Sequence, residues 1–416
     1  MNTNWAGNII YSTNNVHSPS TVEEVQELIK NHSSIRVVGT RHSFNTIADS
    51  DNAQLSTRYL NRIISLDKEN NTVTVEGGIQ YGELCSFLAS EGYALHNLAS
   101  LPHISITGAC VTATHGSGVN NGCLSTAVTA LELVNANGDI ISLSKTKDEK
   151  YFHAAVVNLG AVGVVTKITL QVQASFKMKQ SVFVNMPMAA LENNFKEIMS
   201  AGYSVSLFTD WRNKNINQVW IKEKCIDSTS LAITDFYGAK PAITDLHPLD
   251  GLSAENCTSQ MNVEGEWYER LPHFKMGFTP SSGTELQTEY FIPFDKAYQG
   301  LLAIEKLHEK IAPHLYVSEI RAIAADELWM SPFYQRSSIA FHFTWKQEWE
   351  QVQNLLPLIE EALSPYDPIP HWGKLFVMST ALLKQRVKRL SDFKDFVLEN
   401  DPQQKFSNDY IKYIFS

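Results

Sequence analysis

The sequence predicts an α+β protein of two domains, and three observations lead to this fold class. The chain has 416 residues, 44% of them hydrophobic and 19% charged, and a single core of that size usually divides. Short helical and strand patterns alternate in the first part, whereas later strand candidates are separated by polar loops. We expect a first domain over residues 1–175, a second α+β domain over 176–375, and a tail over about 376–416 that packs back onto the first domain.

The first 175 residues alternate helical and strand patterns. Residues 20–31 begin with a capping box of Thr21 and Glu24 and then place apolar side chains on one stripe, which predicts a helix. Asn137-Gly138 tolerates the positive φ angles of a tight turn and therefore predicts a hairpin. A second helix is expected from Tyr81 to Gly92, and strands are expected at 35–38, 72–76, 128–134, 139–143 and 162–172.

The later part of the chain has a different composition, with loops rich in Asn, Ser, Thr and Pro. Two clear helical patterns occur at about 296–311 and 347–363. A third surrounds Leu382 to Leu398 and precedes a tail that contains Asp401-Pro402 and Lys405-Phe406. The sequence shows neither internal repeats nor low-complexity segments.

Charge and cysteine content exclude several classes of function. A formal net charge of −10 and a sequence pI near 5.7 do not favour nucleic acid or an anionic membrane, because both are negatively charged. A small neutral substrate suits this balance better. The five cysteines have no CxxC pair and no zinc-ligand spacing, and their odd number does not suit a complete disulfide framework. We expect a reducing compartment and no metal site.

The sequence predicts neither a targeting segment nor a membrane span. It begins Met-Asn-Thr-Asn-Trp-Ala-Gly-Asn, without a basic n-region or an apolar h-region. No later apolar run reaches the length of a transmembrane helix. We therefore expect a cytoplasmic protein, and we predict no membrane or protein partner.

Two glycine-bearing loops carry the strongest chemical signal. Residues 37–45 contain Gly39-Thr40-Arg41-His42-Ser43, and residues 105–118 combine glycines at 108, 116 and 118 with small hydroxyl residues. Such turns expose backbone N–H groups, which bind phosphate oxygens. Neither loop matches the GxGxxG pattern of dinucleotide-binding folds or the GxxxxGKS/T pattern of phosphate-binding loops. A large phosphate-bearing ligand is therefore expected in a different kind of fold.

Two strand candidates of the second domain each carry a pair of polar side chains. Glu319 and Arg321 are two positions apart, so they point to the same face of a strand. The same alternation directs His342 and Thr344 to one face and the neighbouring aromatic side chains to the other. Buried charge requires a partner or a ligand. These residues are candidates for a functional site, and the alternative is a Glu319–Arg321 salt bridge on a solvated face.

Several of these motifs together resemble one enzyme family. They look like the FAD domain of the vanillyl-alcohol oxidase superfamily and, within it, the alditol oxidase group. The similar segments span nearly the whole chain and include Gly39–Ser43, Leu101–Ser105, Thr114–Gly118, Glu319–Arg321, His342–Thr344, His371–Lys374 and the Asp401–Phe406 tail. The fold that this resemblance implies is a two-domain FAD-binding fold of vanillyl-alcohol oxidase type with a separate substrate domain.

The resemblance implies FAD joined covalently to His42. A neutral imidazole nitrogen is a nucleophile that can add to the 8-methylene of a flavin tautomer. Some relatives have a second tether through cysteine, but the pattern around Cys110 favours a structural role for its side chain. The cofactor-binding residues that the resemblance implies are Gly39, Thr40, Arg41, His42, Ser43, Ser105, Cys110, Ala113, Gly116, Ser117, Gly118, Val164 beside the adenine, His371 and Lys374.

The resemblance also implies the catalytic set Arg321, His342 and Lys374. Arg321 and Lys374 would place positive charge at the flavin N1–C2=O edge, where it stabilises the reduced anionic flavin. The substrate-binding residues would be Ser105, Glu319, Arg321, His342, Thr344 and Lys374. Sequence does not decide whether His342 or Lys374 is the base, because a coupled pair titrates according to its geometry.

The implied reaction is hydride transfer from the terminal carbinol of an alditol, of the xylitol or sorbitol type, to FAD. The products are an aldose and, after reoxidation by O2, hydrogen peroxide. Two alternatives stay open: a sugar-1,4-lactone oxidase or dehydrogenase of the same superfamily, and a flavin- or sugar-binding protein without turnover.

Overall fold

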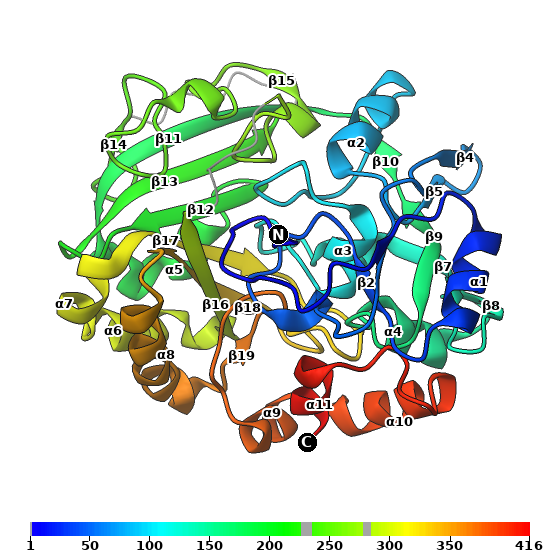
Figure 1. Cartoon of the computed structure of the whole chain (residues 1–416). Coiled ribbons are helices and arrows are strands. Elements are labelled where there is room, and N and C mark those ends of the chain that lie inside the picture. The colour runs from blue at the N-terminus through cyan, green and yellow to red at the C-terminus, as the bar shows by residue number, and fades with distance from the viewer. Residues whose placement is uncertain (1, 226–234, 278–283) are drawn as a thin grey trace.

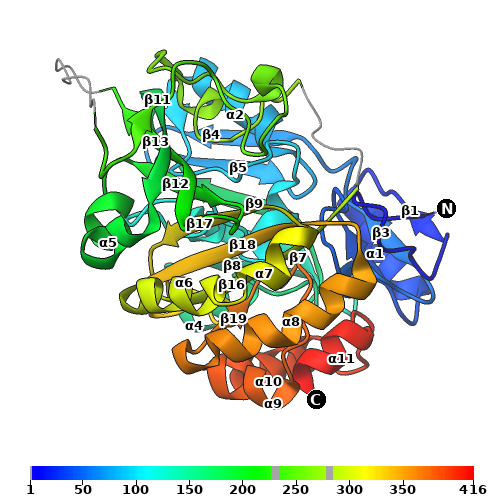
Figure 2. The same ribbon diagram turned by 90° about the vertical axis from the view of Figure 1, so that its left-hand side faces the viewer.

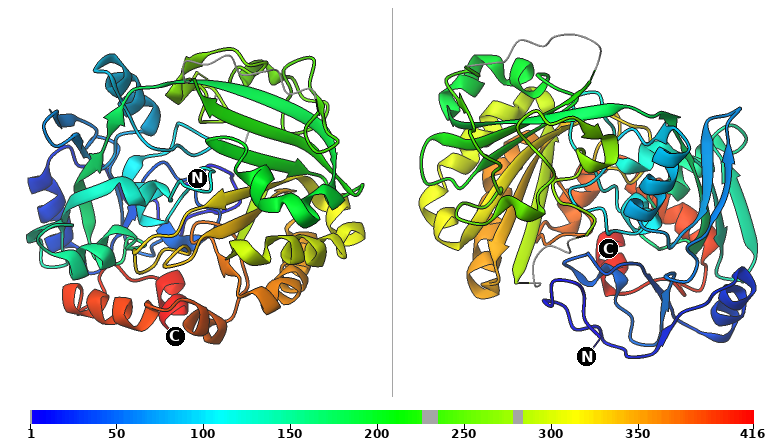
Figure 3. Two further views of the ribbon diagram at one scale, coloured as in Figure 1. Left: turned by 180° about the vertical axis from the view of Figure 1, so that it is seen from behind. Right: turned by 90° about the horizontal axis from the view of Figure 1, so that it is seen from above.

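The computed structural model describes residues 2–225, 235–277 and 284–416. Its mixture of helices and sheets confirms the predicted α+β class. The blue and cyan N-terminal elements form one body, and a large sheet coloured green to orange forms the other (Figure 1). The same division is visible from behind and from above (Figure 3).

The N-terminal body contains a small parallel sheet of order β1-β3-β2 and an antiparallel sheet of order β4-β5-β9-β7-β8. Alternate residues of the antiparallel sheet, among them Val73, Val75 and Ile168, point into one core. The strands are β1 (Val16–His17), β2 (Arg36–Val38), β3 (Gln54–Ser56), β4 (Ile63–Asp67), β5 (Thr72–Glu76), β7 (Val128–Val134), β8 (Ile140–Ser144) and β9 (Val164–Gln171), with β6 (Tyr93–Ala94) paired to β10 (Gln173–Ala174).

The helices of this body include both predicted ones. Helix α1 (Val22–Asn31) begins after Thr21, whose hydroxyl accepts a hydrogen bond from Glu24 N at 3.2 Å, and α2 spans Tyr81–Ser90. A further helix, α4, spans Glu149–Val156. The glycine-bearing loop at 105–118 contains a short helix, α3 (Ile106–Val111), that the sequence did not predict. Six residues that include a glycine have little helix propensity, so α3 depends on its packing in the core.

The second body is built on a nine-stranded sheet of order β14-β11-β13-β12-β17-β18-β16-β19, with β15 paired to β11. Its apolar face, which includes Phe341 and Trp345, packs against helices (Figure 2). The strands are β11 (Lys177–Pro187), β12 (Ser204–Thr209), β13 (Asn215–Lys224), β14 (Lys240–Pro241), β15 (Gly265–Glu266), β16 (Glu285–Pro293), β17 (Leu315–Ile323), β18 (Ser338–Lys346) and β19 (Ile369–Pro370).

The helices over this sheet are α5 (Leu191–Met199), α6 (Ala297–Glu305), α7 (His308–Ile311) and α8 (Trp349–Leu363). The helix expected at 347–363 is confirmed as α8, and the pattern at 296–311 forms α6 and α7 with a short break. The pattern around Leu382 to Leu398 is also two helices, α9 (Thr380–Arg386) and α10 (Leu390–Asn400). An extended residue, Val387, separates them and lets Leu383 and Phe393 reach the same core. In the ranges that the structure describes, no helix is long and apolar enough to cross a membrane.

The C-terminal segment returns to the N-terminal body and ends in α11 (Asp409–Phe415) (Figure 1). Asp401 accepts hydrogen bonds from Lys405 N and Phe406 N at 2.8 and 2.7 Å. That turn directs the Lys405 ammonium to Ile29 O at 2.6 Å. We propose that residues 1–175 with this tail form one domain and 176–375 the other; the chain crosses between the sheets after β10.

Arg36 joins the tail to the N-terminal body from within. Its guanidinium is buried and donates hydrogen bonds to the carbonyls of Ile47, Leu159, Gly160 and Phe406. These carbonyls belong to separate loops that regular secondary structure does not hold together. A planar group with five N–H donors satisfies all of them at once.

Replacing Arg36 by methionine should therefore destabilise the fold. Arg36→Met leaves several buried carbonyls unsatisfied, so the free energy of unfolding should fall by about 3 kcal/mol or more. Urea denaturation measures this change. Arg58→Met, at an exposed arginine, is the control and should change stability by about 0.5 kcal/mol or less. Equal effects of the two substitutions would contradict the role given to Arg36.

Candidate active site

A cavity of about 540 Å³ is lined by loops of the N-terminal body and by the polar face of the nine-stranded sheet. Its size is that of a site for a small molecule or cofactor. The structure brings together in its lining the predicted residues Gly39, Thr40, Arg41, His42, Ser43, Ser105, Glu319, Arg321, His342, Thr344, His371 and Lys374.

The other predicted cofactor residues are not among the described residues that line the cavity, and they lie behind that lining. Ala113 and Cys110 are buried in the N-terminal core, and Val164 is buried beside Gly163 and Val165, which do line the cavity. Burial raises the pKa of the Cys110 thiol to about 12, which supports a structural role for it. The turn of Gly116, Ser117 and Gly118 joins the two bodies, since Gly118 N donates to Ala322 O at 2.8 Å and the Ser117 hydroxyl donates to Val205 O.

His42 lines the cavity, half-buried but with both ring nitrogens shielded from solvent, and its ring stacks on Trp5 with centroids 5.1 Å apart. Among the described residues, neither of its ring nitrogens has a partner with hydrogen-bond geometry. Burial lowers its pKa to about 4, although the Thr40 backbone opposes this in part. The ring is therefore neutral near pH 7 and carries an unused nucleophilic nitrogen, which is what attachment to a ligand requires.

The two predicted cofactor loops approach each other closely. A side chain at Gly39 would place its Cβ 2.5 Å from Ser105 Oγ, so this position requires glycine. Arg41 has a φ of 63° and Ala113 a φ of 54°, a left-handed conformation that L residues rarely adopt. Such strain persists where the surrounding structure fixes the backbone, and it gathers at functional sites.

The polar pairs predicted from strand alternation do share one face. Glu319 on β17 lies opposite His342 on β18, and Arg321 Nε lies 3.5 Å from Glu319 Oε1. His342 Nε2 and Thr344 Oγ1 are 3.1 Å apart. All four side chains line the cavity, and Glu319 and Arg321 are almost completely buried. The pair is not a salt bridge on a solvated face.

Lys374 completes this wall from the loop after β19. Its ammonium donates to His342 Nδ1 at 2.8 Å and to Glu289 Oε2 at 2.7 Å. Burial lowers the pKa of Lys374, and Glu289 opposes the shift. Burial and the Lys374 charge lower the pKa of His342 to about 3. His342 is therefore a neutral imidazole that accepts at Nδ1 and donates from Nε2 to Thr344.

Glu289 on β16 is the residue that sequence reasoning missed. It is fully buried, and its Oε1 lies 3.2 Å from both Arg321 Nη2 and His115 Nε2. Burial alone would raise its pKa, but the charge of Lys374 and its other partners hold that pKa well below its usual value. The sequence does contain a pattern that could have indicated Glu289, since Glu285, Gln287 and Glu289 occupy alternate positions of a strand and so share one face.

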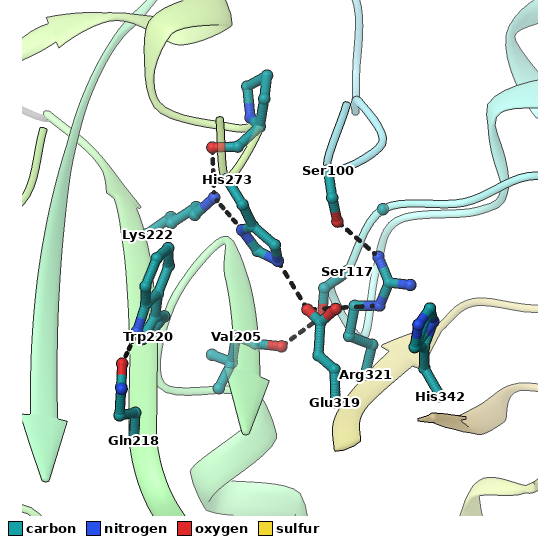
Figure 4. Close-up of polar contacts among 12 residues, drawn as sticks. Ser100, Ser117, Val205, Gln218, Trp220, Lys222, His273, Glu319, Arg321 and His342 are labelled. Atoms are coloured by element: carbon teal, nitrogen blue, oxygen red, sulfur yellow. Dashed lines mark hydrogen bonds and ion pairs between the residues drawn. The ribbon is translucent and has the colours of Figure 1, made fainter. Parts of the chain in front are cut away.

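His273 was also missed, because it lies in a loop without a regular pattern. Its Nε2 is 2.7 Å from Glu319 Oε1, and its ring lines the cavity. Figure 4 shows it between Lys222 and Glu319, beside Arg321 and Ser100. Within the described ranges, no group of three His, Cys, Asp or Glu side chains is placed to hold a metal ion.

Comparison with known proteins agrees with this geometry. Residues 14–144 match the family model of an FAD binding domain, and residues 282–414 match that of D-arabinono-1,4-lactone oxidase. An alditol oxidase from Streptomyces sp. is 44% identical over 413 residues, which cover 99% of this chain and 98% of that protein. The chain belongs to the alditol oxidase family. The resemblance inferred from the motifs is thereby confirmed, and the protein is an FAD-dependent oxidoreductase.

More distant similarities extend over the same length. The L-gulono-1,4-lactone dehydrogenase of Mycobacterium tuberculosis is 28% identical and is aligned over 98% of this chain and 97% of its own length. The crystal structure of cholesterol oxidase from B. sterolicum superposes with a TM-score of 0.80 at 13% identity, covering 100% of this chain and 96% of that one. This superposition shows a common fold of the vanillyl-alcohol oxidase type.

The cavity fits FAD on the side formed by the N-terminal loops. His42 offers a neutral ring without a hydrogen-bond partner in the described part of the chain. Gly39, where a Cβ would meet Ser105 Oγ, lets the two loops lie close together, and Gly39 and Gly108 both line the cavity. Glu319, Arg321 and Lys374 lie on the opposite wall, where they would meet a polar substrate.

Removing the Glu289 charge should disable this wall. Glu289→Gln leaves Lys374 and Arg321 without their shared carboxylate, so the rate of polyol oxidation should fall on the order of a hundredfold. Steady-state peroxide production by the flavin-loaded enzyme measures the effect. Glu360→Gln is the matched control, because Glu360 is also buried but binds Tyr290 outside the cavity. A Glu289→Gln enzyme as active as that control would contradict the central role of Glu289.

Proposed function

We propose that this enzyme oxidises the terminal hydroxyl of an alditol to the aldose and reduces O2 to H2O2. The observation that carries the proposal is a polar wall that faces the same cavity as His42. It consists of the buried side chains of Glu319, Arg321 and His342 and the half-buried Thr344 and Lys374. A chain of hydroxyl groups suits such a wall, because each hydroxyl both donates and accepts hydrogen bonds. The similarity to an alditol oxidase along the whole chain supports the same substrate class.

Different side chains would bind different hydroxyl groups of the polyol. Ser105, Glu319 and Thr344 would bind the hydroxyls that do not react, and Arg321 would add a charged donor. Charge-assisted hydrogen bonds discriminate strongly against an analogue without the hydroxyl. Bound FAD supplies the acceptor for the hydride of the carbinol carbon, and the overall reaction is R–CH2OH + O2 → R–CHO + H2O2.

The reacting hydroxyl must also lose its proton, and the Lys374–His342 pair is placed to receive it. The two nitrogens are 2.8 Å apart, and burial lowers both of their pKa values. A pair that shares one proton at this distance titrates as a unit. We therefore assign the base function to the pair in the form in which Lys374 is an uncharged amine, with Glu289 holding Lys374 in place.

A lactone is the second candidate substrate. Residues 282–414, which include Glu289, Glu319, Arg321, His342 and Lys374, match the D-arabinono-1,4-lactone oxidase model. The L-gulono-1,4-lactone dehydrogenase of Mycobacterium tuberculosis is, however, only 28% identical over 98% of this chain. An alditol is therefore the preferred substrate of our proposal.

A panel of polyols and lactones tests the substrate class. We expect O2 uptake and peroxide with xylitol or sorbitol, and a kcat/KM for sugar-1,4-lactones that is lower by about a hundredfold or more, since a lactone lacks the open chain of hydroxyls. Both substrate classes are measured with the same flavin-loaded preparation. Strong turnover of lactones without turnover of alditols would overturn the proposal, and absence of both would favour a binding protein.

We propose further that FAD is joined covalently to His42. The neutral ring with two shielded nitrogens, unpartnered in the described part of the chain, supports this attachment. Its stacking on Trp5 fixes the plane of the imidazole. A fixed neutral ring directs one nitrogen lone pair, as a nucleophile must.

The proposed covalent bond between FAD and His42 can be tested after denaturation of the protein. Acid-precipitated protein should stay yellow and show flavin fluorescence in a denaturing gel, whereas His42→Ala should lose both signals because alanine has no nucleophilic nitrogen. His308→Ala, on α7 and apart from the described cavity lining, should keep them. Complete release of flavin from the unmodified protein would refute the covalent bond without affecting the assignment of FAD.

A further inference from the structure

A second lysine–histidine pair lies behind Glu319 (Figure 4). Lys222 on β13 is fully buried, and its ammonium lies 2.6 Å from Leu271 O, 3.0 Å from Pro272 O and 3.1 Å from His273 Nδ1. The other nitrogen of the ring, His273 Nε2, lies 2.7 Å from Glu319 Oε1. A continuous line of polar contacts therefore runs from the sheet interior to the substrate wall.

The number of donors on Lys222 decides the tautomer of His273. An ammonium group has three N–H donors, and Lys222 has three acceptors: two carbonyls and one imidazole nitrogen. His273 Nδ1 must then accept, so the proton of the neutral ring is on Nε2. That proton points at Glu319 Oε1, which accepts it. Burial lowers the pKa of His273 to about 4 despite the nearby Glu319 charge, in agreement with a neutral ring.

The same arrangement occurs once more in the cavity wall. Lys374 donates to His342 Nδ1, and His342 Nε2 faces the Thr344 hydroxyl. In both pairs an ammonium fixes the tautomer, and Nε2 meets a side chain that our proposal assigns to substrate binding. The difference is position: Lys374 lines the cavity, whereas Lys222 lies behind the described lining. Lys222 therefore acts on the substrate only through His273 and Glu319.

The surroundings of His273 hold its ring in one place. Its ring packs edge-on against Phe208 and Trp220, with centroids 5.6 and 5.2 Å away and interplanar angles of 65° and 75°. Its backbone N donates to Ser100 O at 3.1 Å, and its carbonyl accepts from Thr258 N at 2.9 Å. Turning the imidazole over would break the contacts of its two nitrogens with Lys222 and Glu319.

A buried ammonium with three neutral partners is costly to the fold. Burial lowers the pKa of Lys222 to about 7, while Glu319 opposes the shift, and a charge in such a place destabilises the protein unless something compensates for it. The two carbonyl contacts alone would tie residues 271–272 to the sheet, which a neutral donor could also do. The contact with the imidazole is the one that bears on Glu319, because a donor at Lys222 Nζ and the acceptor Glu319 Oε1 together place the ring proton on Nε2.

We propose that Lys222 and His273 are positioning residues that hold the Glu319 carboxylate in one orientation and thereby set the affinity for the polyol. With Oε1 occupied by His273 Nε2–H, Oε2 is left to accept from a substrate hydroxyl. The inference rests on the proposed function in that it takes Glu319 to bind the polyol.

We call the chain of contacts from Lys222 through His273 to Glu319 the relay. A double-mutant cycle tests this relay in the flavin-loaded enzyme. Anaerobic flavin reduction by xylitol gives a dissociation constant and a limiting rate for the wild type, Lys222→Met, Glu319→Gln and the double variant. Each single substitution should raise the dissociation constant about tenfold, and Lys222→Met should leave the limiting rate within about twofold. The double variant should bind no more weakly than Glu319→Gln alone, because both changes remove one interaction.

Rescue at His273 separates positioning from a merely structural role. A glutamine amide can donate to Glu319 from near the Nε2 position, so His273→Gln should bind xylitol more tightly than His273→Leu, and the difference should vanish with Glu319→Gln. Lys405→Met is the matched control, since Lys405 is another buried lysine bonded to a carbonyl, and it should leave the dissociation constant unchanged. These His273 variants complete the test if Lys222→Met does not fold.

The outcomes distinguish the relay from the proposed function. Additive effects in the cycle, or equal binding by the two His273 variants, would overturn the relay while leaving polyol oxidation intact. A wild-type enzyme whose flavin xylitol does not reduce would overturn the proposed function instead. If Glu319→Gln alone binds xylitol normally, Glu319 does not hold the polyol and the relay fails with it.

Discussion

The carboxylate of Glu289 compensates two cations that the fold has removed from water, Lys374 and Arg321. The three residues come from β16, β17 and the loop after β19, which are distant in sequence. A slip of one residue in any of these strands would turn a side chain to the other face and leave a buried charge unpaired. The charge cluster therefore forms only in the native strand register. It also makes other registers less stable, because each of them would leave a buried charge unpaired.

This constraint gives the cavity two unlike walls. On the N-terminal side the lining includes loop backbone, small and apolar side chains, the cation Arg41 and the neutral ring of His42. On the sheet side, Glu319, Arg321 and Lys374 are charged but matched with one another and with Glu289. A flavin and a polyol need such different surroundings, since one presents a flat ring and phosphates and the other a row of hydroxyls. Each body of the protein supplies the wall for one of them.

The sequence predicted the site residues that follow from local strand alternation, and it missed residues whose position depends on tertiary packing. Alternation placed Glu319 with Arg321 and His342 with Thr344, because a strand has a period of two wherever it lies. Glu289 follows the same alternation, but no motif marked it. Lys222 stands beside Glu223 and Lys224 and so looks like the solvated end of a strand, whereas His273 belongs to a loop whose course depends on distant contacts. The helical pattern around Leu382 to Leu398 likewise gave no sign of the extended residue that divides it.

The two lysine–histidine pairs also explain why a lysine does not contact Glu319 directly. An ammonium beside that carboxylate would present several donors and would compete with the substrate hydroxyl for its oxygens. An imidazole between them presents a single N–H, which occupies one oxygen and leaves the other free. The charge stays close enough to help keep Glu319 ionised, yet it remains behind the cavity lining. In the proposed mechanism the order is reversed at the reacting end, where Lys374 would itself reach the substrate, and Lys374 does line the cavity.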